Sequence, residues 1–249
     1  MSAALDALYA ACARRALANA AGQASRACRA LASASSEVER ALEGVTLADV
    51  PRSLRNFAAG TSDGSGASGR ESRKRGVACL RLRAEAEYHV SAFVFDAGAS
   101  IPLHNHPEMC VSMRVLFGSA RVRAFDFLEE APVLSAEEAR AGRGRSHAVR
   151  MVMDETLDAS TSCRSLEPRR ANVHEIVAVT PCAILEVQTP PYAIGLGRDC
   201  HYFEVVGDGE WSPASGSSSP SPRGAFVLRE VGQPAAYACA RFNSDGEFD

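Results

Sequence analysis

The sequence predicts an all-β protein, a barrel or jelly roll, that carries helices at its N-terminal end. Two observations support this fold class. The first part of the chain is rich in Ala, Arg and Leu, and the part after residue 76 contains eight or more short apolar segments. Ala is the strongest helix former, whereas short alternating segments separated by turn residues are typical of antiparallel strands. We therefore expect a helical N-terminal segment over residues 1–50 and one β domain over residues 77–242.

The N-terminal segment has a helical pattern. Residues 1–43 contain no proline, and apolar side chains recur at helical spacing from Leu5 to Leu17. We expect two helices, with a break near Gly22 or within residues 33–36. The same stretch bears arginines and few acids, so it also resembles an organellar transit peptide, and this alternative stays open. The later "EVERALEG" run suits a folded helix better.

Strand-like segments follow one another after residue 76. They include "VACLRL", "YHVSAFVFD", "VSMRVLFG" and "ARVRAFDF", and they resume with "HEIVAV", "AILEVQT" and "HYFEVV". Three stretches lack this pattern because they are polar or rich in Gly and Ser. We expect loops there, over residues 60–76, 135–171 and 212–224.

Composition excludes several classes of function. A length of 249 residues with 46% hydrophobic content is enough for one sizeable domain. A net charge of -3 gives no electrostatic reason to bind nucleic acid or an acidic membrane. No long apolar run and no signal-peptide pattern are present, so we expect no membrane association, a cytoplasmic or nuclear location, and eight mostly reduced cysteines.

The stretch "IPLHNHPEM" carries two histidines, His104 and His106. Side chains two residues apart share one face of a β-strand, so both imidazoles can bind one metal ion inside a barrel. An exposed polar strand is the alternative for an isolated pair of this kind. The spacing of the neighbouring glycines favours the metal site over this alternative.

Gly98 lies six residues before His104, and Gly118 lies twelve residues after His106. This spacing resembles the first cupin motif, G-x5-H-x-H-x4-E-x6-G, although Val111 occupies the position of the motif's glutamate. The third ligand must come from the second half of the chain, where His174 begins the next run of strands.

The predicted ligands are therefore three histidines: His104, His106 and His174. Three neutral imidazoles leave an Fe(II) ion with its full charge, which attracts an anionic thiolate and lowers the pKa of the thiol. We expect one Fe(II) per chain, although zinc can use the same ligands. The remaining histidines that we considered are left out of the metal site: His89, His147 and His201.

The signatures "PLHNHPEM" and "PCAILEV…PPY…GRDCHYF" occur in this order within residues 77–206. Together they resemble the thiol dioxygenase family of plant cysteine oxidases and animal cysteamine dioxygenase. The resemblance implies a cupin-like double-stranded β-helix (jelly-roll) barrel, one iron on the three histidines, and conversion of a thiol and O2 into a sulfinic acid. Plant members act on the N-terminal cysteine of proteins and mark them for degradation when oxygen is present. The "FGSARVRAFDF" run is closer to the plant type.

Four other residues are implied as site residues by the resemblance. Tyr192 would hydrogen-bond oxygen or substrate near the iron, unless its ring only packs on a turn. Cys200 and Tyr202 match a pair that forms a thioether in some related dioxygenases, but two core side chains would look the same. Glu186 stands where the family usually has Asp and would receive the substrate amine or orient a ligand histidine. Its extra methylene moves the carboxylate by about 1.5 Å.

Three hypotheses follow for the function. The first is a dioxygenase of N-terminal cysteine in proteins, of the oxygen-sensing type. The second keeps the chemistry but uses cysteamine or free cysteine as the substrate. The third is a metal-binding cupin without catalysis. The expected partners are O2 and a thiol, with no nucleic acid and no membrane, and the chain is expected to be a monomer.

Overall fold

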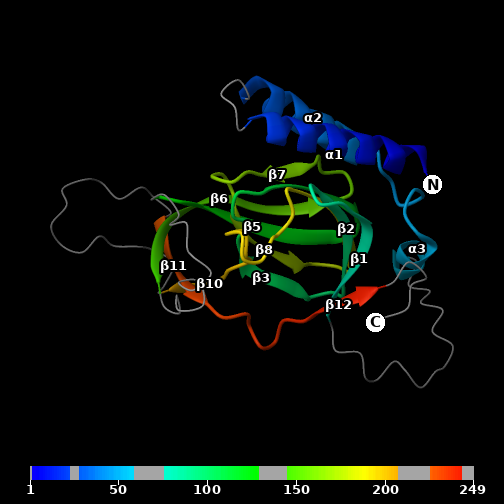
Figure 1. Ribbon diagram of the computed structural model, residues 1–249. Coiled ribbons are helices and arrows are strands. Elements are labelled where there is room, and N and C mark those ends of the chain that lie inside the picture. The colour runs from blue at the N-terminus through cyan, green and yellow to red at the C-terminus, as the bar shows by residue number, and fades with distance from the viewer. Residues whose placement is uncertain (1, 23–27, 59–75, 129–144, 207–224, 243–249) are drawn as a thin grey trace, which may run out of the picture.

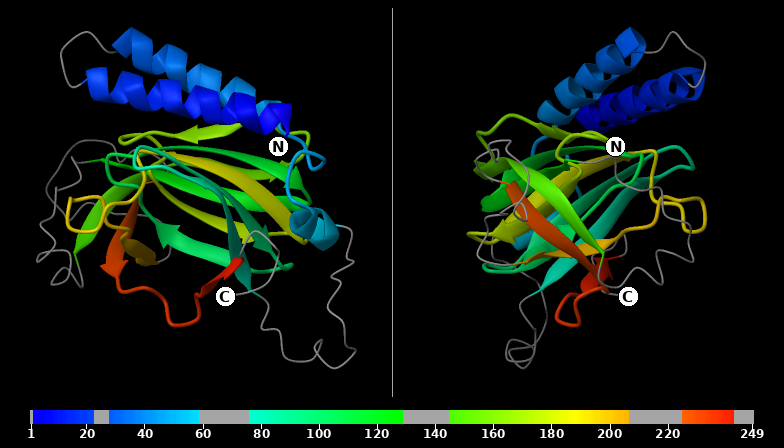
Figure 2. Two further views of the ribbon diagram at one scale, coloured as in Figure 1. Left: turned by 45° about the vertical axis from the view of Figure 1, so that its right-hand side comes forward. Right: turned by 90° about the vertical axis from the view of Figure 1, so that its left-hand side faces the viewer.

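The computed structural model describes residues 2–22, 28–58, 76–128, 145–206 and 225–242. Two antiparallel helices lie across one face of a β-sheet, and this sheet packs against a second, curved sheet (Figures 1 and 2). Strands make up most of the described β domain. The predicted fold class, an all-β barrel with N-terminal helices, is confirmed.

The N-terminal segment forms α1 (Ala3–Gly22), α2 (Cys28–Glu43) and the short α3 (Arg52–Ala58). The predicted break near Gly22 is confirmed, whereas α2 runs without interruption through residues 33–36. None of the described helices combines the length and the apolar character that a membrane span requires.

The C-terminal end of α2 is held by a side chain of the sheet. Arg114 donates to the backbone carbonyls of Leu42 and Val45, at 3.3 and 3.2 Å, and also to that of Glu43. The last carbonyls of a helix have no partner within the helix, and a cation at this end is favourable. Arg114 therefore anchors α2 to the sheet.

The first sheet has six strands, and the helices cover its outer face (Figure 1). In spatial order the strands are β12 (Cys239–Phe242), β1 (Val77–Ala84), β2 (His89–Phe95), β9 (Cys182–Thr189), β4 (Cys110–Phe117) and β7 (Arg164–Leu166). Neighbouring strands are antiparallel except β12, which adds to β1 in parallel.

The second sheet closes on itself as a small barrel. Its order is β10 (Tyr202–Val206), β11 (Ala225–Val231), β6 (Ser146–Asp158), β5 (Ser119–Phe127), β8 (Val173–Ala178) and β3 (Ser100–His104). All of its pairings are antiparallel. The closing contact, between β10 and β3, is the pair Tyr202 and His104.

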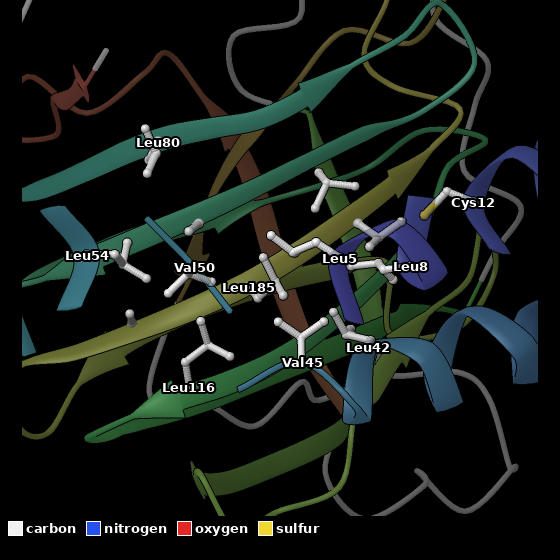
Figure 3. Close-up of a cluster of buried hydrophobic side chains, with 14 of the residues drawn as sticks. Leu5, Leu8, Cys12, Leu42, Val45, Val50, Leu54, Leu80, Leu116 and Leu185 are labelled. Carbon is white, nitrogen blue, oxygen red and sulfur yellow. The ribbon is translucent and has the colours of Figure 1, made fainter. Parts of the chain in front are cut away.

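Two apolar clusters hold these layers together. One lies between the helices and the first sheet, where Leu5, Leu8 and Leu42 face Leu116 and Leu185 (Figure 3). Burying each such leucine contributes about 1.5 to 3 kcal/mol. The second cluster fills the space between the two sheets and includes the following residues: Val111, Met113, Val122, Ile176 and Ile184.

The predicted loop over residues 135–171 is wrong where the structure describes it. Residues 146–158 form β6, which pairs with both β5 and β11, and residues 164–166 form β7. Most side chains of β6 are exposed or half-buried. The strand therefore lacks the clear alternation of apolar and polar residues from which a strand is predicted. Backbone pairing on both edges holds it instead. The predicted loops at 60–75 and 212–224 lie outside the described residues.

Candidate metal centre

Three aromatic rings stand in a row across neighbouring strands. His104, the last residue of β3, pairs with His174 of β8 on one side and with Tyr202 of β10 on the other. Directly paired residues point to the same face of a sheet. The ring centre of His104 is accordingly 4.5 Å from that of His174 and 6.3 Å from that of Tyr202.

His106 completes this group from beyond the end of β3. Its ring centre lies 4.9 Å from that of His104 and 5.0 Å from that of His174. The expectation that both histidines occupy one strand is wrong, because β3 ends at His104. Asn172 positions His106 instead: its Oδ1 accepts from the His106 N–H at 3.0 Å, and its Nδ2 donates to the His106 carbonyl at 2.7 Å. Sequence reasoning missed Asn172.

The three histidines fit a metal ion. Within the described residues they form a group whose ligand atoms all lie within 4.8 Å of one another. Nδ1 of His106 and both ring nitrogens of His174 are buried without a hydrogen-bond partner. A buried polar atom left in this way costs about 1 to 3 kcal/mol. Coordination of a metal ion would satisfy such nitrogens.

Burial keeps these imidazoles neutral. It lowers the pKa of His104 to about 4 and holds the pKa of His106 and of His174 well below the usual value. Nδ1 of His104 lies 2.8 Å from the carbonyl oxygen of Pro102, and donation there leaves Nε2 as the free lone pair. A neutral histidine fixed in one tautomer by a backbone carbonyl is typical of metal ligands.

Tyr192 lies against the ligand His106. The two rings stack with their centres 5.0 Å apart, and the Tyr192 oxygen is 3.5 Å from Nε2 of His106. The hydroxyl donates to the backbone carbonyl of Asn105 at 2.7 Å. Burial raises the pKa of Tyr192 well above its usual value, so the group is a neutral phenol. The structure thus brings Tyr192 to the predicted site.

Cys200 lies between two phenols. Its thiol is free, and the hydroxyls of Tyr192 and Tyr202 lie close enough to the sulfur to act on the pKa of the thiol. Burial raises the pKa of Cys200 to about 11, although the two tyrosine hydroxyls oppose the rise. Cys200 precedes β10, which begins at Tyr202, and the two side chains lie close to each other. A thioether between them stays a prediction.

Glu186 lies on β9, in the sheet that faces the histidines. It is 4% exposed, and its neighbours on the adjoining strands are Ser91 and Met113. Oε1 accepts a hydrogen bond from the amide of Gln188 at 2.7 Å. Burial raises the pKa of Glu186 to about 7, while the Gln188 amide and the charge of Arg81 oppose this. Glu186 is therefore a buried carboxyl, on the sheet opposite the histidines, that accepts a hydrogen bond from a neutral group.

The other histidines have separate contacts, as predicted. His89 lies 2.8 Å from Arg81, and His147 lies 2.8 Å from Glu230. His147 belongs to β6, however, and not to a loop. The backbone of His201 donates to the side chain of Asn105.

The comparisons with known proteins agree with this geometry. A family model described as PCO_ADO matches residues 41–247. The 2-aminoethanethiol dioxygenase of Mus musculus is 36% identical over 158 residues, which are 57% of this chain and 59% of that protein. Plant cysteine oxidase 1 of Arabidopsis thaliana is 31% identical over 128 residues, which are 51% of this chain and 41% of that protein. The chain thus matches about half the length of these relatives.

Among solved structures, a cupin superfamily protein from Desulfitobacterium hafniense is similar. The match is 14% identical, covers 49% of this chain and 84% of that chain, and has a TM-score of 0.33. The family model, in contrast, covers both the sheets and the three histidines. The chain therefore belongs to the PCO_ADO family, that of the plant cysteine oxidases and the 2-aminoethanethiol dioxygenases.

Proposed function

We propose that the chain is a non-haem iron thiol dioxygenase, which converts a thiol and O2 into a sulfinic acid. Both oxygen atoms are added to the sulfur, so R–SH and O2 become R–SO2H and no further reductant is needed. One observation supports this most strongly. Three buried, neutral imidazoles converge next to a phenol and a thiol, and no carboxylate takes part in that group of the described residues.

His104, His106 and His174 would hold one Fe(II) per chain. Iron(II) in this position supplies the one-electron chemistry through which O2 reacts with a thiolate. Because the three ligands carry no charge, the positive charge remains to attract the substrate thiolate and to lower its pKa. Tyr192 places a neutral hydroxyl beside His106, where it can orient a polar group of the substrate or of O2.

Glu186 would bind the ammonium group of the substrate. N-terminal cysteine and cysteamine share one unit, an amine separated from the sulfur by two carbons. A buried carboxyl facing the histidines is suited to that amine, because a buried charge needs an opposite charge. The hydrogen bond of Glu186 comes from Gln188 and not from a ligand histidine, which favours amine binding over orientation of a ligand.

We propose that the substrate is the N-terminal cysteine of a protein, and that the reaction serves oxygen sensing. The segment between Tyr192 and Cys200 supports a substrate that extends beyond one residue. It carries two strongly exposed apolar side chains, Ile194 at 87% and Leu196 at 72%. A peptide would cover such side chains, whereas cysteamine has no chain beyond its amine that could contact them. The relatives named 2-aminoethanethiol dioxygenase support the second candidate, a small aminothiol.

The test offers two substrates to the Fe(II)-loaded protein and follows oxygen consumption together with product mass. One is a short peptide that begins with cysteine, with its N-acetylated form as the control that lacks the ammonium group. The other is cysteamine. Two added oxygens on the free peptide but not on the acetylated one would support the proposal. Oxidation of cysteamine but not of the peptide would shift the function to small-thiol metabolism. No product with iron bound would favour a cupin without catalysis.

The same samples test the predicted thioether. Joining Cys200 to the Tyr202 ring removes the thiol hydrogen and one ring hydrogen, with O2 as the oxidant. The intact mass of the chain would then fall by two hydrogens after aerobic turnover. A Cys200→Ser variant serves as the control that cannot form the bond.

A further inference from the structure

The connection between β11 and β12 carries a half-buried tyrosine that packs against the apolar cluster between the two sheets. Residues 232–238 lead from the closed barrel to the edge of the first sheet (Figure 1). Within this connection Ala236 and Ala238 are exposed, whereas Tyr237 is turned inward. Its ring packs on the apolar cluster that fills the space between the two sheets. Tyr237 therefore lies on the side of the sheets that also bears the metal centre.

The backbone of the connection fixes this direction. The Tyr237 N–H donates to the carbonyl of Pro234 at 2.9 Å, and the amide of Gln233 donates to the Tyr237 carbonyl at 3.2 Å. Two residues later, Cys239 enters β12 and pairs with Val77 of β1. A turn at one end and a parallel strand at the other thus hold Tyr237 in place.

Tyr237 packs against Tyr202. The two ring centres are 6.0 Å apart and the planes are inclined by 57°. Tyr202 also faces His104, with ring centres 6.3 Å apart. The ring of Tyr202 therefore neighbours both a candidate metal ligand and Tyr237, and it links the C-terminal connection to the candidate metal centre. Tilted ring pairs at this separation attract one another.

The environment of the Tyr237 hydroxyl belongs to the same site. Burial raises the pKa of Tyr237 above its usual value, and Cys239, Tyr202, Cys200 and Glu186 contribute in the same direction. These groups act on Tyr237 because they lie within electrostatic range of it. Three of them, Tyr202, Cys200 and Glu186, are groups that the sequence places in the substrate site.

We propose that Tyr237 is a positioning residue of the thiol pocket, which acts by holding the ring of Tyr202 against the metal centre. This inference rests on the proposed function, because the ring of Tyr202 would form the wall against which the substrate thiol is oriented. Loss of the Tyr237 ring would leave space into which Tyr202 can turn. A displacement of about 1 Å in a reacting group can reduce the rate a hundredfold.

The first test compares Tyr237→Ala with Tyr237→Phe. Kinetics are measured with the cysteine-initiated peptide, per bound iron, well below the melting temperature of each variant. We expect kcat/KM to fall at least tenfold in Tyr237→Ala, and to return to within about threefold of the wild type in Tyr237→Phe, because the ring does the positioning. Tyr9→Ala is the matched control, since Tyr9 lies on α1 beneath Arg83 and packs on the other cluster.

A double-mutant cycle shows whether Tyr237 acts through Tyr202. If it does, Tyr237→Ala should have less than a threefold effect in a Tyr202→Ala background, because effects of coupled residues are not additive. If the two substitutions reduce kcat/KM independently, so that their effects multiply, Tyr237 does not act through Tyr202 and the proposal is overturned in that respect. A Tyr237→Ala variant with full iron and a kcat/KM within twofold of the wild type would overturn the inference itself.

Anaerobic calorimetry provides a readout that does not depend on turnover. The Fe(II)-loaded chain is titrated with the same peptide, and Tyr237→Ala should bind it about tenfold more weakly than Tyr237→Phe, since a truncated ring orders the site less well. If the wild-type chain neither binds nor oxidises thiols, the proposed function and this inference fail together. If the wild type does both and Tyr237→Ala matches it, this inference fails and the proposed function stands.

Discussion

Asn172 holds His106, a candidate metal ligand, through both polar atoms of its side chain. The Oδ1 atom accepts from the His106 N–H at 3.0 Å, and Nδ2 donates to the His106 carbonyl at 2.7 Å. Both residues are buried, at 4% and 1% exposure. His106 lies beyond the end of β3, so no neighbouring strand pairs with its backbone. The two hydrogen bonds with Asn172 fix the His106 backbone instead. A ligand histidine is thus fixed by a residue that comes 66 positions later in the chain.

Asn172→Ala should weaken metal binding. It leaves the buried His106 N–H without an acceptor, while the His106 carbonyl keeps the hydrogen bond from the Met109 N–H at 3.1 Å. Loss of a residue that orients a ligand typically reduces metal affinity about 10- to 100-fold. Competition with a chelator measures the affinity. Asn172→Asp keeps the acceptor but loses the donor, so it should fall between the wild type and Asn172→Ala. Equal affinity in all three proteins would contradict this role.

His174→Ala should abolish iron binding. It removes one of three ligands, and the ring nitrogens that it removes are buried without another partner. Iron per folded chain, measured by elemental analysis, should fall from one to near zero. His147→Ala is the matched control, because His147 is a partly buried histidine that pairs with Glu230 outside the metal group. It should destabilise the fold by about 1 to 3 kcal/mol, since Glu230 loses its partner, yet keep its iron.

Glu186→Gln should stabilise the protein at high pH. Burial raises the pKa of Glu186 from 4.5 to about 7, so the folded chain keeps a proton that the unfolded chain releases. The free energy of unfolding therefore decreases as the pH rises from about 4.5 to 7, by up to about 3 kcal/mol, and then stays level. The metal-free variant should be more stable than the metal-free wild type at pH 8 and similar to it at pH 4, as measured by urea unfolding.

Glu186→Gln should also lose activity, because it no longer offers a negative charge to the substrate amine.

Glu175→Gln is the control for the effect on stability, since its carboxylate is paired with Arg123 at the surface of the barrel. This change should not stabilise the protein at any pH. A Glu186→Gln variant that is less stable than the wild type at pH 8 would mean that the carboxyl is already ionised and well paired.

Gly118→Ala should destabilise the fold far more than Gly98→Ala. Both glycines have a positive φ, of 70° and 78°. A Cβ atom at Gly118 would lie 2.0 Å from the Pro181 carbonyl oxygen and 2.7 Å from the Cys182 Cβ, whereas at Gly98 nothing lies within 4 Å. We expect about 1 kcal/mol for Gly98→Ala from backbone strain, and about 3 kcal/mol or more for Gly118→Ala. Equal losses in thermal stability would contradict the close approach at Gly118.

Local patterns in the sequence predicted much of this structure. The Ala-rich helices, most strands after residue 76 and the three grouped histidines are each marked by a pattern that spans only a few residues. The two glycines of the cupin-like motif also proved to need positive φ angles. Strand β6 was missed because its side chains are largely exposed, so that its stability comes from pairing with strands on both edges.

Residues that act over long distances in the chain were missed as well. The sequence around Asn172 and Tyr237 carries no pattern that marks either residue. Their contacts with His106 and Tyr202 form only when the fold brings distant parts of the chain together. Strand alternation predicted that His106 lies beside His104, and the structure does bring the two rings together, but not on one strand. The last step, from His104 to His106, depends on Asn172 and not on strand geometry.

The most direct test of the proposed function uses isotopically labelled O2. The Fe(II)-loaded chain is given a peptide that begins with cysteine, in unlabelled water, and the product is analysed by mass spectrometry, with His174→Ala as the metal-free control. The proposal predicts that the peptide sulfur gains two labelled oxygen atoms in the wild type and none in the control. Unchanged peptide in the presence of one bound iron per chain, or oxygen that comes from water, would contradict it.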